Sequence, residues 1–211
     1  MKKRLIYVIG GGDCEGYSNW MNIDGYTTIE KANFCLGVGG SDIGNKYYNQ
    51  PNSGYLGINA WVDNIEFEDY QKAIKLGKPM VCICKGSQWL AALAGGAVFQ
   101  HVQHPYRHEI KTFDGKTLIT NSLHHNMADL SNLKENIDYK LLAWAENLSP
   151  FHINGWNKSI ECGREPEVVY YPKIKGLGIQ PHPEMMFLNA EFKPMLQWYS
   201  NILTKFLADN L

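Results

Sequence analysis

A cysteine between a short apolar segment and a helical segment constrains the fold of this chain more than any other feature. Residues 80–83 are apolar, Cys84 follows them, and the sequence after Lys85 has the composition of a helix. A strand that turns directly into a helix projects the residue at the corner from the carboxyl edge of a sheet. The helix directs its unpaired N–H groups and the positive end of its dipole at that side chain. The segment therefore predicts a nucleophilic Cys84.

The residues beside Cys84 agree with this interpretation. Gly86 is small enough for the helix to begin close to the strand, and the amide of Lys85 is placed to donate to an oxyanion beside the sulfur. The alternative is an ordinary buried cysteine in a parallel strand, because free cysteine is among the most buried residue types. Cys82 fits that alternative.

A second segment supplies a base for the cysteine. Residues 176–184 predict a short strand that ends in a proline-flanked turn carrying His182, with Glu184 two residues later. A carboxylate at that spacing can hold the imidazole through its other nitrogen. Cys84, His182 and Glu184 together provide a nucleophile, an acid and base, and an orienting group, so we predict that they form a catalytic triad.

Several segments, taken together, resemble the class I glutamine amidotransferase family. Within it they most resemble the γ-glutamyl hydrolase branch, which includes the γ-glutamyl-γ-aminobutyrate hydrolases. The matches keep the family order over about positions 4–187, and they lie at residues 38–48, 77–79, 83–88, 94–96, 120–126 and 180–184. The chain departs from the family pattern at Asn45, Cys82 and Pro181, which puts substrate choice in doubt more than chemistry.

The resemblance implies a reaction. In such enzymes a cysteine thiolate attacks a γ-glutamyl amide, the histidine protonates the leaving nitrogen, and water hydrolyses the resulting thioester. By position, Cys84 is the nucleophile, His182 the acid and base, and Glu184 the orienting group. The oxyanion hole falls on Lys85 and Gly40, with Gly39 as the alternative to Gly40. The substrate-binding positions implied are Gly39, Gln88, Asn121, Ser122 and His125; for the last three, a plain strand-end turn is an equal alternative.

Alternating apolar segments and helical patterns predict the fold. Strands are expected at residues 4–9, 34–38, 80–83 and 178–180, and helices at 63–76 and 189–207. We therefore predict an α/β fold, a doubly wound and mostly parallel sheet of the flavodoxin-like kind seen in class I glutamine amidotransferases. The Asp114-Gly115 turn joins two strands of a hairpin at one edge, and 159–161 with 168–171 are expected to form a second hairpin.

Composition narrows the function classes. The chain has 211 residues and 45% hydrophobic content, which suits one domain over 1–211. With 20 basic and 21 acidic side chains, it has no charge excess that would favour nucleic acid or an anionic membrane. The start shows no signal peptide and the cysteine count is odd, so we expect a cytoplasmic protein with reduced thiols.

Neither a cofactor nor a metal is expected. Gly10, Gly12 and Gly16 follow the first strand, but their spacing differs from a dinucleotide fingerprint. His101, His104 and His108, with His124 and His125, could suggest a metal site, but the first three have no nearby acidic or cysteine partner at metal-ligand spacing.

Three functional alternatives stay open. The favoured one is a hydrolase acting on a small γ-glutamyl substrate. The second is a glutaminase subunit that supplies ammonia to a separate synthetase, and the third is a binding module that has lost the chemistry. The intact Cys84, His182 and Glu184 speak against the third. The sequence decides neither the group on the γ-nitrogen nor whether the chain forms a homo-oligomer.

Overall fold

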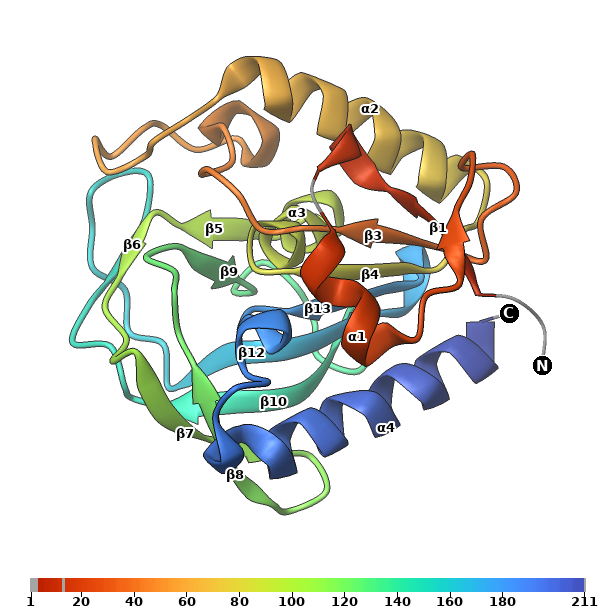
Figure 1. Ribbon diagram of the computed structural model, residues 1–211. Coiled ribbons are helices and arrows are strands. Elements are labelled where there is room, and N and C mark those ends of the chain that lie inside the picture. Colours follow the sequence, from red (N-terminus) through yellow and green to blue (C-terminus); the bar gives the residue numbers. More distant parts are fainter. Residues whose placement is uncertain (1–3, 13, 211) are drawn as a thin grey trace.

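The computed structural model describes residues 4–12 and 14–210, which fold around a nine-stranded mixed sheet (Figure 1). The sheet order is β2-β1-β3-β4-β13-β12-β10-β7-β8. The parallel part comprises β1 (Leu5–Val8), β2 (Gly25–Tyr26), β3 (Phe34–Gly37), β4 (Met80–Ile83) and β13 (Gly176–Ile179). The antiparallel part comprises β7 (Arg107–Thr112), β8 (Thr117–Asn121), β10 (Lys140–Glu146) and β12 (Arg164–Tyr171).

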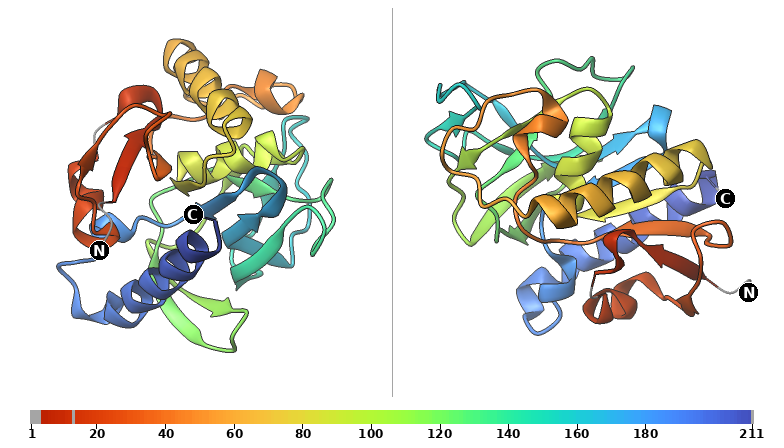
Figure 2. Two further views of the ribbon diagram at one scale, coloured as in Figure 1. Left: turned by 90° about the vertical axis from the view of Figure 1, so that its right-hand side faces the viewer. Right: turned by 90° about the horizontal axis from the view of Figure 1, so that it is seen from above.

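Helices cover both faces of the sheet, as Figure 2 shows. On one face, α2 (Ala60–Lys75) and α3 (Lys85–Leu93) pack in a core that includes Cys35, Met80 and Tyr171. On the other face, α1 (Ser18–Met21) and α4 (Lys193–Asn210) pack on Phe34 and Val81. Neighbouring strand residues such as Met80 and Val81 thus serve opposite cores, which is why these strands are apolar throughout. The predicted doubly wound α/β fold is confirmed.

Smaller elements complete the chain outside the main sheet. Two short pairs of strands join β5 (Ala97–Phe99) with β9 (Met127–Asp129), and β6 (His101–Val102) with β11 (His152–Ile153). Single turns of 3₁₀ helix lie at η1 (Ile9–Gly11), η2 (Glu15–Tyr17), η3 (Asn45–Tyr48), η4 (Pro172–Ile174), η5 (Pro183–Met185) and η6 (Ala190–Phe192). Among the described residues, no helix has both the length and the apolar character needed to cross a bilayer.

The two predicted hairpins had different outcomes. β7 and β8 form the first one, and Gly115 at its turn has a φ of 80°, a conformation that glycine adopts easily. The second prediction was wrong, because Ser159 forms only an isolated bridge with Ile153. Both edges of β12 are already paired, one with β10 and the other with β13, so no edge is left for residues 159–161.

Candidate active site

The corner at Cys84 is as sharp as the sequence predicts. β4 ends at Ile83, α3 begins at Lys85, and Cys84 between them has φ 50° and ψ −107°. Such a conformation costs a residue other than glycine about 1–3 kcal/mol, and such strain clusters at functional sites. Gly86 makes the turn feasible, because a Cβ there would lie 2.8 Å from the carbonyl oxygen of Gly37 on the neighbouring strand. The fold thus holds a buried cysteine at the carboxyl edge of the sheet.

His182 lies between Cys84 and Glu184. It follows β13, the strand beside β4, so the two corners meet at the same edge of the sheet. His182 Nδ1 lies 2.6 Å from Glu184 Oε1, and Cys84 is close enough to the imidazole to affect its pKa. Burial by itself would lower the pKa of His182, but the hydrogen bonds to Cys84 and Glu184 outweigh burial and raise it to about 10. The structure therefore brings the three predicted residues together; their catalytic roles stay predictions.

Gly39 and Gly40, which follow β3, lie beside these residues. A Cβ on Gly39 would lie 2.8 Å from His182 Cε1 and 3.7 Å from Cys84 Cβ, so the absence of a side chain leaves room for the imidazole. The N–H of Gly39 donates to Tyr17 Oη at 3.4 Å. Gly40 lies beside the aliphatic part of Lys85. Gly39 thus lies beside Cys84, and Gly40 lies beside Lys85, the residue that follows Cys84.

Tyr17 is a site residue that the sequence analysis did not identify. Besides Gly39, it lies near Glu184 and Cys84, and burial together with these two groups raises the pKa of its hydroxyl well above the usual value. Its segment precedes α1 and is far from the other site residues in sequence. Nothing in the local pattern around Tyr17 marks it out.

Asn121 holds the backbone of His182 through two hydrogen bonds. Its Oδ1 accepts from the His182 N–H at 2.9 Å, and its Nδ2 donates to the His182 carbonyl at 2.9 Å. The side chain is fully buried at the end of β8. The sequence resemblance implied substrate binding for Asn121, whereas this geometry uses both ends of its amide to fix the histidine turn.

Three more residues are implied in substrate binding, and their side chains differ in burial and in hydrogen-bond partners. Gln88 is buried, and its Nε2 donates to the carbonyl of Asn126 at 3.0 Å, so it anchors the loop after β8. Ser122 is buried in the same loop and its Oγ has no hydrogen-bond partner among the described residues. His125 is partly exposed and lies 3.1 Å from Asp42 Oδ2, a contact that raises its pKa.

A buried ion trio, made of Lys85, Asp63 and Glu66, joins α3 to α2. Lys85 Nζ lies 2.9 Å from Asp63 Oδ1 and 2.8 Å from Glu66 Oε2. Asp63 also accepts the N–H of Gly44 at 2.8 Å, and Glu66 accepts the indole N–H of Trp89 at 2.7 Å. Thus the Lys85 side chain is anchored away from the sulfur, although the residue directly follows Cys84. The acidic partners were not predicted, because on a helix they are indistinguishable from solvent-facing charges.

The structure also bears on the expectations for the cysteines, for a dinucleotide site and for a metal site. All five cysteines are free, in agreement with reduced thiols. Among the described residues, only the four-residue α1 follows the loop at Gly10 before β2, so that loop does not open the long helix of a dinucleotide site. The reason given against a metal was wrong: Glu167 lies within reach of both His104 and His108. This carboxylate comes from β12, far along the chain.

Comparisons with known proteins place the chain in a family and agree with its fold. Residues 24–130 match the model of the family described as Peptidase C26. Protein NtpR of Enterococcus hirae is 26% identical over 171 residues, which cover 74% of this chain and 69% of NtpR. Among solved structures, a glutamine amidotransferase of Thermotoga maritima superposes with a TM-score of 0.58 at 15% identity, over 97% of this chain and 85% of that one. A protein of Thermoplasma acidophilum, described as a putative GMP synthase subunit, gives 0.57 at 15% identity, over 99% and 96%.

Proposed function

Because the chain belongs to the Peptidase C26 family and has the fold of a class I glutamine amidotransferase, we propose that it hydrolyses a γ-glutamyl amide bond with Cys84 as nucleophile. The substrate is glutamine or a γ-glutamyl amine, and residues 1–211 act as one domain. One observation carries the proposal: the imidazole of His182, held through Nδ1 by Glu184 at 2.6 Å, lies next to the strained Cys84 on the other side of Gly39.

The proposed reaction has two halves. The Cys84 sulfur, after giving its proton to His182, attacks the γ-carbonyl carbon and forms a tetrahedral oxyanion. The imidazolium then protonates the leaving nitrogen, the C–N bond breaks, and a γ-glutamyl thioester remains. Water attacks the thioester with His182 as base, which releases glutamate and restores the thiol. Glu184 keeps the Nδ1 proton in place throughout.

The oxyanion hole in this proposal consists of the N–H groups of Lys85 and Gly40. Lys85 is the first residue of α3, where backbone N–H groups have no partner within the helix. Gly40 is favoured over Gly39, because the Gly39 N–H is directed at Tyr17 Oη. Ser122 and His125 are the implied substrate-binding residues whose polar groups are not bound to backbone, and we assign the acceptor side of the pocket to them.

A second candidate is a glutaminase subunit that passes ammonia to a separate synthetase. It is supported by the likeness to the Thermoplasma acidophilum protein, whose description is that of a synthase subunit. The isolated chain distinguishes the two candidates. A hydrolase releases glutamate without any partner protein, whereas a subunit of this kind needs its partner for turnover.

The test is a screen of the purified chain with glutamine and a panel of γ-glutamyl amines, with release of free glutamate as the signal. Cys84→Ala should lower kcat by a factor on the order of a thousand or more. Cys82→Ala is the matched control, because Cys82 is a buried strand cysteine two residues away and contacts Tyr70. An active Cys84→Ala protein would refute the nucleophile assignment. Turnover that appears only when a second protein is added would favour the synthetase alternative.

A further inference from the structure

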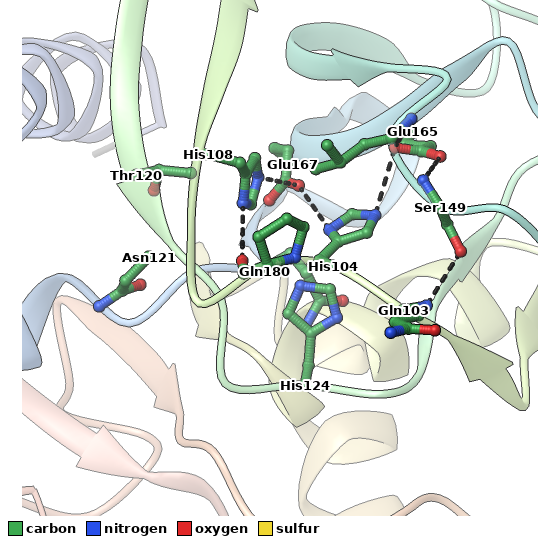
Figure 3. Close-up of polar contacts among 12 residues, drawn as sticks. Gln103, His104, His108, Thr120, Asn121, His124, Ser149, Glu165, Glu167 and Gln180 are labelled. Carbon is green, nitrogen blue, oxygen red and sulfur yellow. Dashed lines mark hydrogen bonds and ion pairs between the residues drawn. The ribbon is translucent and has the colours of Figure 1, made fainter.

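A buried histidine and glutamate cluster lies in the antiparallel part of the fold (Figure 3). It consists of His104 in the loop before β7, His108 on β7, and Glu165 and Glu167 on β12. The side chains of all four are at most 2% exposed. None of these residues takes part in the proposed reaction, so the cluster needs an explanation of its own.

The ligand-type atoms of the cluster converge on one point. One atom each from His104, His108 and Glu167 lie within 4.8 Å of one another. Glu167 Oε1 lies 3.0 Å from His108 Nε2 and 3.4 Å from His104 Nδ1. A tetrahedral zinc site with bonds of about 2.0–2.1 Å places its ligand atoms roughly 3.3 Å apart. The two measured separations are close to that value.

The hydrogen-bonding capacity of the rings does not match their surroundings. His104 faces a carboxylate with each nitrogen, Glu165 with Nε2 and Glu167 with Nδ1. His108 faces Glu167 with Nε2 and the carbonyl oxygen of Pro105 with Nδ1. A neutral imidazole has one N–H, and ionised carboxylates and carbonyls only accept. Each ring therefore directs one bare nitrogen at an oxygen, unless it gains a second proton or binds a cation there.

The surroundings have the features of a metal site's outer shell. If His104 binds a cation through Nδ1, its Nε2 carries the proton and lies 3.2 Å from Glu165 Oε2, so that a carboxylate stands on the far side of the ring. Glu165 is itself held by the N–H groups of Leu148 and Ser149 at 3.1 and 2.8 Å. The equivalent partner of His108 is the carbonyl of Pro105. Both rings thus have an acceptor on the side away from the shared oxygen.

Four buried atoms in and beside the cluster have no hydrogen-bond partner among the described residues: both ring nitrogens of His104, Glu167 Oε2 and His124 Nε2. The His124 Nδ1 faces the carbonyl of Asn126 at 2.9 Å and therefore carries the proton, so Nε2 presents a lone pair. Its ring centroid lies 5.1 Å from that of His104. Unpartnered buried acceptors of this kind are costly unless a donor or a cation meets them.

We propose that His104 Nδ1, His108 Nε2 and Glu167 Oε1 bind one divalent cation of the zinc class, with water or His124 Nε2 in the fourth position. Imidazole and carboxylate ligands suit Zn²⁺, and a divalent charge balances the two buried carboxylates. The bound ion is structural: it joins the loop before β7, and β7 itself, to β12.

The experiment measures metal binding directly. The full chain in a Cys84→Ala background, which removes the candidate nucleophile as a thiol ligand, is dialysed against a chelator and titrated with Zn²⁺ and with Co²⁺. We expect about one ion per chain, a visible spectrum of tetrahedral Co²⁺ without thiolate bands, and a higher Tm with Zn²⁺. Glu167→Gln and His108→Asn should each weaken binding by at least about 10- to 100-fold. Glu109→Gln is the matched control, an exposed glutamate on β7 that should bind as wild type.

The same preparation reveals the competing state. Without a cation, His104 holds a second proton between its two carboxylates: burial lowers its pKa, but Glu165 and Glu167 outweigh burial and raise it to about 9. Long-range ¹H–¹⁵N spectra distinguish an imidazolium from a metal-bound ring. A chain that takes up no Zn²⁺ or Co²⁺ while His104 is an imidazolium overturns the proposal, and so does metal uptake that Glu167→Gln leaves unchanged. Neither result bears on γ-glutamyl hydrolysis, which depends on other residues.

Discussion

Replacing Gly39 by alanine tests whether the position of the imidazole matters. The backbone of Gly39 is outside the left-handed region, so alanine fits the main chain. Its Cβ, however, would lie 2.8 Å from His182 Cε1. Carbon atoms in contact prefer about 3.5–4.0 Å, so the ring must move by roughly 0.7–1.2 Å. Asn121 fixes the backbone of His182, so the ring has to turn away from Cys84 or Glu184.

The expected effect is on catalysis and not on folding. A displacement of about 1 Å at a reacting group costs on the order of a hundredfold in rate, so kcat of Gly39→Ala should fall by about that factor. Glutamate release measures the rate, and thermal denaturation followed by circular dichroism measures stability. Gly163→Ala is the control, because a Cβ on Gly163 would have no atom within 4 Å.

A double variant isolates the cause. Once His182→Ala has removed the ring, Gly39→Ala has nothing to displace, so the double variant should be no slower than His182→Ala alone. If Gly39→Ala is folded and keeps its kcat within about threefold of wild type, the imidazole does not need this position. The proposed role of His182 would then be wrong.

Two further predictions concern stability and pH. Asn121→Ala should lower the free energy of unfolding by about 1–3 kcal/mol, because two backbone groups of His182 lose their partners. It should also lower kcat more than it raises KM. Urea denaturation and steady-state kinetics measure these effects, and a change in KM alone would indicate that Asn121 contacts the substrate instead. Burial raises the pKa of Glu165, but hydrogen bonds from His104, His152 and the Ser149 N–H outweigh it and lower the pKa to about 2. The ionised carboxylate therefore stabilises the fold by about 3 kcal/mol above pH 4.5, and this contribution disappears as the pH falls toward 2. The stability difference between wild type and Glu165→Gln should shrink over that interval, and a difference that is constant with pH would contradict the assignment.

Local patterns were sufficient to predict the candidate nucleophile and its partner. The corner at Cys84 and the turn at His182 each depend on a few consecutive residues, and parallel neighbours bring their carboxyl ends to one edge. The Asn121 contact to His182 joins residues 61 positions apart, and it depends on how β8 ends relative to β13. No spacing rule along the chain encodes such a contact.

β12 shows why part of the fold escaped prediction. The sequence predicted a strand only from Val168, because Pro166 argues against a strand interior and glutamates argue against burial. In the structure the strand begins at Arg164, and Glu165 and Glu167 are both fully buried. Their histidine partners make that burial feasible, and these partners come from the loop before β7, from β7 and from β11. A pattern of single residues cannot reveal charges that are neutralised by distant segments.

The buried ion trio of Lys85, Asp63 and Glu66 limits which substitutions these positions can accept during evolution. Replacing Lys85 by a neutral residue leaves two buried carboxylates without their cation, at a cost of about 3–5 kcal/mol, whereas replacing one of the acids leaves Lys85 paired with the other. Relatives that keep both acids should therefore keep a cation at position 85. A library that seeks new substrates does best to hold these three positions fixed and to vary the largely irregular segment 49–59, which precedes α2.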